Sequence, residues 1–151
     1  MKYKPLKIDI KFHPIFIVGQ NPGKRGFNDS PYAWDGATRT SNFVRECIQG
    51  HHNLYLSNVC NYKDLTIPHV EEGVEDLKRD IKRYMPRKII CLGAFAFDYV
   101  SKIVNPESGI KVYRLAHPSY VLRFNYGVEA FKEEIKRILN EWTRKTNTIN
   151  W

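Results

Sequence analysis

Apolar residues gather in a few short runs along the chain, and turn-forming residues flank each run. The runs at residues 15–18 and 88–92 are almost continuously apolar, as is typical of strands that are buried on both faces of a sheet. Two further strands are predicted at 54–59 and 111–116, after the turn sequences GHHN and NPESG. We therefore expect four strands.

Between these runs the apolar spacing changes to three and four residues. Val74, Leu77, Ile81 and Tyr84 follow this period until Pro86, which predicts an amphipathic helix from about residue 70. Shorter helices are predicted at 41–49, capped by Thr40 or Ser41, and at 94–104. A last helix places one apolar face on Val128, Phe131, Ile135, Ile138, Leu139 and Trp142.

Strands that alternate with helices favour a parallel sheet, because parallel neighbours need crossover connections and the crossovers cover both faces. The predicted fold is therefore an α/β, three-layer α/β/α sandwich with a central four-stranded, mainly parallel sheet. We expect one domain over residues 1–151, with 1–13 and 144–151 as loose ends.

The amino-acid composition indicates a class of binding partner. The chain has 42% hydrophobic residues and a formal net charge of +8, and this basic excess favours a polyanion such as nucleic acid. No apolar run is long enough for a membrane span, and the first residues do not form a secretion signal. Three cysteines without a C-x-x-C spacing suggest reduced thiols. We expect a monomer in the cytoplasm or nucleoid, without membrane contact.

Polar residues stand at the carboxyl ends of three of the four predicted strands. They are Gln20 with Asn21, Asn58, and His117 with Ser119. Ligands of open parallel sheets bind beyond the carboxyl ends of the strands, and a buried amide without a partner costs about 1–3 kcal/mol. The sequence therefore predicts a polar pocket at this edge of the sheet.

Two kinds of site do not fit these residues. Gly19 and Gly23 stand too close for a nucleotide-triphosphate loop, and Arg25 occupies the place of its hydroxyl residue. The cysteines and histidines lack zinc or iron–sulfur spacing, so we expect no metal. Recognition of a nucleobase remains, because an Asn amide can pair with the N3–H and O4 edge of a pyrimidine.

Four ordered segments resemble the uracil-DNA glycosylase superfamily. They read GQNPG at 19–23, LYLSNVCNYK at 54–63, YMPRKIICLGAFA at 84–96 and HPSYVLR at 117–123. The resemblance implies a glycosylase that flips out uracil or a related modified pyrimidine. Such an enzyme hydrolyses the N-glycosidic bond with a positioned water, needs no cofactor, and acts as a monofunctional enzyme of base excision repair.

Roles for the pocket residues follow from this resemblance, position by position. Asn21 would hold the attacking water, and His117 would stabilise the leaving pyrimidine anion. Asn58 would read the N3 and O4 edge of the base, and the backbone N–H of Gln20 would contact O2. The fastest branch of the family has Asp where this chain has Asn21, so we predict slower turnover.

The resemblance also implies contacts with the base and with DNA, which is single- or double-stranded. Tyr32 matches the aromatic residue that stacks on the base, with Phe27 as the alternative. Three apolar residues of a predicted loop suit a wedge that fills the space left by the flipped nucleotide. The expected DNA contacts are Lys24, Arg25, Ser119, Tyr120, Val121, Leu122 and Arg123, of which Tyr120, Val121 and Leu122 form the wedge.

Two other classes of function stay open. A non-excising base-binding member of the same fold, or one that acts on a modified pyrimidine, would keep the same pocket. A structural or protein-interaction domain is the third interpretation, but it leaves the polar strand ends and the basic excess unexplained.

Overall fold

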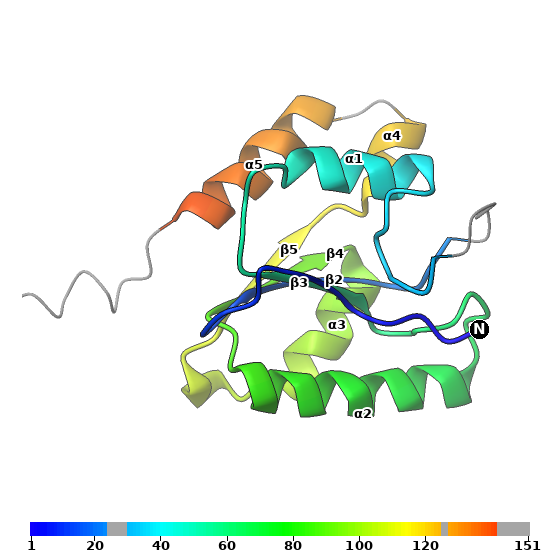
Figure 1. Ribbon diagram of the computed structural model, residues 1–151, viewed down its shortest axis with the longest axis vertical. Helices are drawn as coiled ribbons and strands as arrows, with labels where there is room; N and C mark the ends of the chain where they lie inside the picture. The colour runs from blue at the N-terminus through cyan, green and yellow to red at the C-terminus, as the bar shows by residue number, and fades with distance from the viewer. Residues whose placement is uncertain (24–29, 125–126, 142–151) are drawn as a thin grey trace, which may run out of the picture.

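Five strands form one sheet at the centre of the molecule, and four of them are parallel (Figure 1). This computed structural model describes residues 1–23, 30–124 and 127–141. The spatial order is β1-β3-β2-β4-β5. The strands are β1 (Leu6–Ile8), β2 (Ile15–Gly19), β3 (Leu54–Asn58), β4 (Lys88–Leu92) and β5 (Lys111–Leu115).

The predicted α/β class is confirmed, but the sheet has five strands rather than four. The additional strand, β1, lies within the segment 1–13 that was expected to be a loose end. It pairs antiparallel with β3, with Leu6 opposite Leu56. Three residues with a lysine in the middle are too few to show the hydrophobic pattern of a strand. They form an edge strand because the backbone N–H and C=O groups of β3 on that side are free to pair with them.

Two helical layers cover the sheet, as Figure 1 shows. The helices α1 (Arg39–Cys47), α4 (Pro118–Arg123) and α5 (Val128–Asn140) lie on one face. On the other face lie α2 (Ile67–Tyr84) and α3 (Ala94–Ile103), which a short 3-10 turn at Pro106–Ser108 follows. Among the described helices, none is both long and apolar enough to cross a bilayer.

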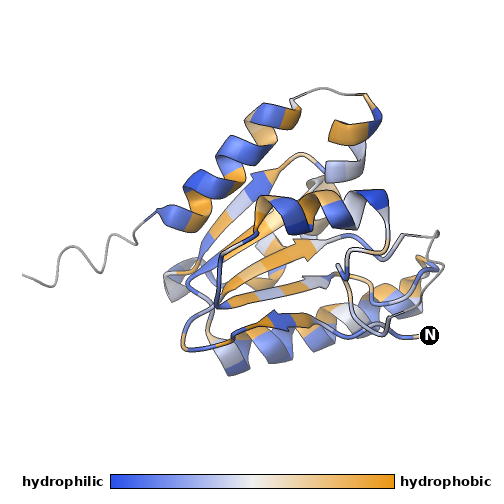
Figure 2. Ribbon diagram, turned by 45° about the horizontal axis from the view of Figure 1, so that its top comes forward, coloured by the Kyte–Doolittle hydropathy of each residue, from blue (hydrophilic) through white to orange (hydrophobic). Residues whose placement is uncertain are grey.

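Alternate residues of each central strand point into two separate cores. Ile15 and Ile17 of β2 pack under α1 and α5, whereas Phe16 and Val18 pack under α2 and α3. All four side chains are at most 2% exposed. The mostly orange colouring of the central strands in Figure 2 reflects this burial on both sides, whereas the edge strands carry blue segments.

Helix ends differ from the prediction where a cap was misassigned. The N-cap of α1 is Thr38, whose hydroxyl accepts the Ser41 N–H at 3.1 Å, rather than Thr40 or Ser41. Thr66 caps α2 in the same way, so α2 begins three residues before Val70. In both cases the capping threonine lies four or five residues before the first apolar residue of the predicted pattern.

Two buried contacts hold helices against the sheet. Gly73 of α2 lies so close to the end of β3 that a Cβ atom there would stand 1.7 Å from the Val59 carbonyl oxygen. Lys88, at the start of β4, is fully buried and donates to the carbonyl oxygens of Ile138, at 2.6 Å, and Glu141 at the end of α5. The layers are therefore fixed at both ends of the strands.

Candidate active site

The ends of β2 and β3 run together at the carboxyl edge of the sheet. Gly19 stands opposite Asn58 in register. Beyond the strands, the Val59 N–H donates to the Gly19 carbonyl and the Cys60 N–H to the Gln20 carbonyl, both at 2.9 Å. Half-buried Gln20 is thereby fixed beside the residues that follow Asn58.

Asn21 is oriented by the segment that follows β3. Its side-chain Nδ2 donates to the Lys63 carbonyl oxygen at 2.9 Å. An Asn amide has two donor hydrogens on nitrogen and one acceptor oxygen. This contact therefore fixes the orientation of the amide, with Nδ2 toward Lys63 and Oδ1 on the other side. Such an oxygen can orient a water molecule but is a far weaker base than a carboxylate.

Asn58 presents a buried polar atom without a partner. The residue is 3% exposed, and its Oδ1 accepts no hydrogen bond from the described residues. An unsatisfied buried amide oxygen costs about 1–3 kcal/mol, so a donor from a ligand or from a water molecule would stabilise Asn58.

The aromatic neighbour of this amide is Trp34, a residue that the sequence analysis missed. A Cβ atom at Gly19 would lie 2.5 Å from Trp34 Cζ2 and 2.6 Å from Asn58 Oδ1, so the indole and the amide meet over Gly19. The indole Nε1 donates to the Ser57 carbonyl oxygen at 2.9 Å. This segment has no apolar period, so the sequence could not distinguish Trp34 from its neighbour Tyr32.

Tyr32 lies in an exposed stretch beside the first residues of the chain. Tyr32 is 44% exposed, and its backbone forms an isolated parallel β-bridge with Lys4. Among the described residues, Tyr32 makes no contact with another aromatic ring at the strand ends. Its stacking on a base stays a prediction.

His117 is held in one tautomer. Its Nδ1 accepts the Ser119 backbone N–H at 3.1 Å and lies 2.6 Å from the Ser119 hydroxyl oxygen. A backbone N–H can only donate, so Nδ1 carries no hydrogen and Nε2 carries the hydrogen. Burial lowers the pKa of the His117 imidazole, which favours this neutral form.

Gly93 brings the end of β4 against this imidazole. The Gly93 N–H donates to the Leu115 carbonyl oxygen at 2.8 Å, and a Cβ atom on Gly93 would lie 3.2 Å from His117 Cβ. Its φ of +100° is one that side chains rarely adopt. The strand ends of β2, β3, β4 and β5 therefore meet at one edge, as the sequence predicts.

The wedge prediction is wrong for Val121. The segment after His117 is the helix α4, not a loop, and Val121 is 2% exposed within the core. Half-buried Leu122 packs against the same core. Pro118 at the first helical position and His117 as N-cap favour this turn of helix, and an amphipathic helix then turns its aliphatic residues inward.

Two aromatic rings form the exposed apolar surface of α4 instead. Tyr120 is 53% exposed and Phe124 57% exposed, and their ring centres lie 4.8 Å apart. The exposed Arg123 places its guanidinium carbon 5.4 Å from the Phe124 ring centre. Ser119 is exposed at the start of the helix. Lys24, Arg25 and Phe27 lie outside the described residues.

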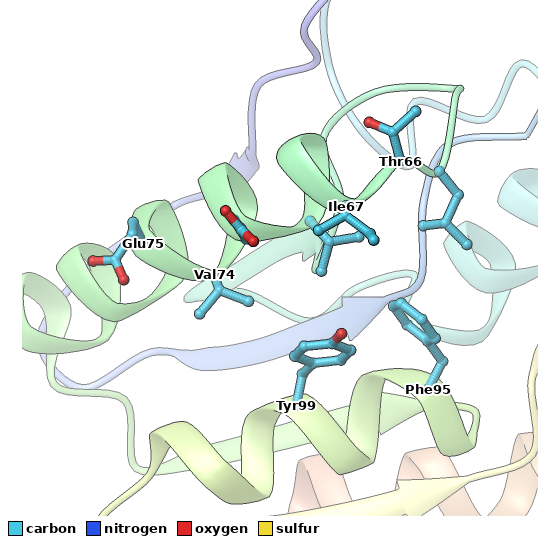
Figure 3. Close-up of a pocket in the computed structure, with 9 residues that line it drawn as sticks. Thr66, Ile67, Val74, Glu75, Phe95 and Tyr99 are labelled. Carbon is cyan, nitrogen blue, oxygen red and sulfur yellow. The ribbon is translucent and has the colours of Figure 1, made fainter.

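A separate apolar groove of about 680 Å³ runs between α2 and α3 (Figure 3). Val74, Phe95 and Tyr99 are among the residues that line the groove, and Glu71 and Glu75 also line it. None of its lining residues belongs to the polar strand ends. Carboxylates repel phosphate, so this groove is unsuited to a DNA backbone.

The buried thiol of Cys91 is not suited to nucleophilic chemistry. Cys91 is 0% exposed in β4, and burial raises the pKa of its thiol to about 12. A thiol of this kind is almost fully protonated at pH 7. The polar groups that can act on a ligand at the strand ends are therefore amides, backbone N–H groups and one imidazole.

Comparison with known proteins shows which family this chain is related to. A search of the curated proteins finds no match. The crystal structure of wild-type SMUG2 from Pedobacter heparinus is similar in fold, with a TM-score of 0.53 and 15% sequence identity, over 86% of this chain and 77% of that chain. The family model of the uracil DNA glycosylase superfamily matches residues 8–143. The chain thus belongs to the uracil DNA glycosylase superfamily.

Proposed function

We propose that this protein removes uracil, or a closely related pyrimidine, from DNA by hydrolysing the N-glycosidic bond as a monofunctional glycosylase. Superfamily membership supports a DNA glycosylase. The observation that carries the choice of base is the buried, unpaired Oδ1 of Asn58 at the strand edge. This acceptor has no donor among the described residues, and uracil carries a matching donor at N3.

Base discrimination follows from the Asn58 amide. Its oxygen accepts the N3–H of uracil, and its NH₂ group donates to O4. Cytosine presents an acceptor at N3 and a donor at N4, so both contacts would be repulsive. A site built for one hydrogen-bond pattern rejects the reverse pattern strongly, because its buried groups are left unpaired.

Bond cleavage develops negative charge on the departing pyrimidine. The Nε2–H of neutral His117 and the backbone N–H of Gln20 are the proposed donors to O2. Fixed donors aimed at developing charge typically contribute a factor of 10² to 10³ each. Asn21 would orient the attacking water without accepting its proton, which is consistent with slow turnover.

The exposed Tyr120 and Phe124 rings replace Val121 and Leu122 as the proposed wedge. Aromatic side chains that enter a base stack offset the loss of stacking when a nucleotide flips out. Arg123, Lys24 and Arg25 are proposed phosphate contacts, and the chain is proposed to act as a monomer where DNA lies, in the cytoplasm or nucleoid.

The decisive experiment measures alkali-labile strand scission of single-stranded and duplex oligonucleotides that carry uracil opposite A or G. We expect scission by the parent protein and a loss of about 10²-fold or more in His117→Ala. Asn58→Asp tests base reading separately, since a carboxylate cannot donate to O4 and repels it.

His52→Ala is the matched control, because His52 lies away from the strand ends and pairs with Asp9 on the surface. It should retain the parent rate. DNA binding without scission at enzyme excess, for every uracil substrate, would instead favour the non-excising or modified-pyrimidine alternative. That alternative has one observation in its favour: Asn21 stands where a stronger base would give faster hydrolysis.

A further inference from the structure

Residues 2–4 run in an extended path beside the candidate active site, and we call them the strap. The Lys4 N–H donates to the Pro31 carbonyl oxygen at 2.7 Å, and the Ala33 N–H donates to the Lys4 carbonyl oxygen at 2.8 Å. These two bonds clasp the backbone on both sides of Tyr32. The strap therefore fixes the segment that leads directly into Trp34.

On its other side the strap contacts the segment that orients Asn21. Tyr3 is 7% exposed, and its backbone N–H donates to the Asn61 carbonyl oxygen at 2.8 Å. The Lys63 ammonium lies 5.9 Å from the centre of the Tyr3 ring. The carbonyl of the same Lys63 accepts the Asn21 amide hydrogen. Tyr3 thus packs on the residue that sets the Asn21 side chain.

Lys2 ties the start of the strap to α2. Its ammonium lies 2.9 Å from Asp76 Oδ2 and 3.6 Å from Glu72 Oε2. Asp76 Oδ2 also accepts the Asn61 side-chain amide at 3.3 Å. The Lys2 pair is partly exposed and so contributes little to overall stability, but it fixes where the strap begins.

Trp34 needs such support because its backbone is strained. Its φ of +54° lies in the left-handed region, which costs a bulky residue about 1–3 kcal/mol. A strained conformation persists only where the surrounding contacts impose it. Here the Trp34 carbonyl accepts from Arg45 at 3.2 Å, the indole donates to Ser57, and the strap holds the preceding residues.

We infer that the strap is a positioning element of the active site. It sets the Trp34 indole against Asn58 on one side and, through Lys63, the Asn21 amide on the other. Strap residues reach the site only through these intermediaries, so they are positioning residues rather than catalytic residues. The inference rests on the proposed function for its effect on excision, but not for its effect on Trp34.

The test uses a parent in which Trp34 is the sole tryptophan, made with Trp142→Phe and Trp151→Phe. Tyr3→Ala removes the buried ring, and Tyr3→Phe keeps it. Acrylamide quenching of Trp34 fluorescence should rise at least twofold in Tyr3→Ala and stay at the parent value in Tyr3→Phe. Single-turnover excision of uracil should fall about 10- to 100-fold in Tyr3→Ala only, because small displacements of positioned groups cost this much.

Tyr84→Ala is the matched control for loss of a tyrosine ring. Tyr84 ends α2, and its ring centre lies 6.4 Å from that of Phe16 and 5.7 Å from that of Tyr55, away from Trp34. This variant should therefore lose stability without changing Trp34 quenching. Circular dichroism and thermal melting establish that each variant is folded. If Tyr3→Ala does not fold, Lys2→Glu replaces it in both measurements, quenching and excision. This substitution places a carboxylate against Glu72 and Asp76 and so should release the start of the strap.

Parent-like quenching in a folded Tyr3→Ala or Lys2→Glu protein overturns the positioning role. The quenching measurement needs no substrate, so it decides this question even where the parent shows no excision. Absence of excision in the parent with increased Trp34 quenching in Tyr3→Ala would count against the proposed function and support the strap. Parent-like excision in a folded variant with raised quenching would also overturn the role.

Discussion

Gly19 sits between the indole of Trp34 and the amide of Asn58, and the space between them admits no Cβ atom. The glycine is needed here for close approach, because the absence of a side chain lets the Trp34 indole and the amide proposed to read the base meet. The first glycine of GQNPG therefore has a steric role that the motif alone did not reveal.

Gly19→Ala should displace Trp34 or Asn58 and lower excision at least tenfold. The forced packing should also lower the free energy of unfolding by about 1–3 kcal/mol. Gly23→Ala is the comparison for stability, because a Cβ atom there would meet only Thr38 Cγ2 at 3.7 Å, an ordinary contact. Denaturant melts of both variants and a uracil-release assay of Gly19→Ala measure the effect; equal melts would contradict it.

The His117 imidazole makes a second prediction at this scale. Burial places its pKa below the ordinary value of about 6.5, so it is neutral at pH 7. Single-turnover excision should be constant above about pH 6.5 and fall in acid, because a protonated Nδ1 cannot accept the Ser119 N–H. Nitrogen NMR of the imidazole should report hydrogen on Nε2 only, and a signal from hydrogen on Nδ1 at neutral pH would refute this assignment.

The same shift has a consequence for stability, with a definite sign. The unfolded chain takes up a proton on His117 near pH 6.5, before the folded chain does. The free energy of unfolding therefore falls as the pH drops from about 6.5 toward the lower folded pKa. In His117→Gln this part of the pH dependence should be missing from thermal melts.

Among the elements, helices and strands with a clear period were predictable and short, context-dependent ones were not. The strands β2 and β4 were found to within one residue, because full burial leaves an almost unbroken apolar run. The strand β1 depends on β3 for its partner, and α4 depends on a proline and an N-cap in a stretch that resembled a loop. Local pattern could not foresee either dependence.

The residues of the candidate site likewise fall into those that the sequence could predict and those that it could not. Asn21, Asn58 and His117 lie at or just beyond the carboxyl ends of strands, so the sheet topology brought them to one edge. Trp34 belongs to an irregular segment that other segments hold in place, and Val121 was misassigned because α4 was not foreseen. Positions fixed by the sheet were predictable, and positions fixed by tertiary contacts were not.

Gly73 offers a test of how tightly α2 must lie on the end of β3. Gly73→Ala would place a Cβ atom 1.7 Å from the Val59 carbonyl oxygen, so α2 must shift. The free energy of unfolding should fall by about 3 kcal/mol or more, since the obstacle is backbone. Glu75→Ala, on the exposed side of the same helix, should change it by about 0.5 kcal/mol or less. Similar urea midpoints for the two variants would exclude this tight contact.

On the scale of the whole molecule, charge of one sign dominates, with a formal net charge of +8. Affinity for DNA should therefore weaken steeply with salt, since each neutralised phosphate releases counterions. The apolar groove between α2 and α3, which Glu71 and Glu75 border, does not attract phosphate, so the proposed DNA path crosses the strand ends and α4.

Arg123→Ala should reduce the slope of log affinity against log salt by about one, because it removes one proposed phosphate contact. Arg83→Ala removes the same charge from the last turn of α2 and should leave the slope unchanged. Fluorescence anisotropy of a labelled oligonucleotide from 50 to 200 mM salt measures both slopes. Identical slopes for Arg123→Ala and the parent would remove Arg123 from the DNA contact.

The strap also bears on how the protein should be handled. Met1 is 67% exposed, but the very next residue pairs with Asp76 and the one after it is buried. An affinity tag or fused domain joined at Met1 therefore constrains the segment that holds Trp34. The tagged protein should excise uracil more slowly than the same protein after the tag is cleaved off.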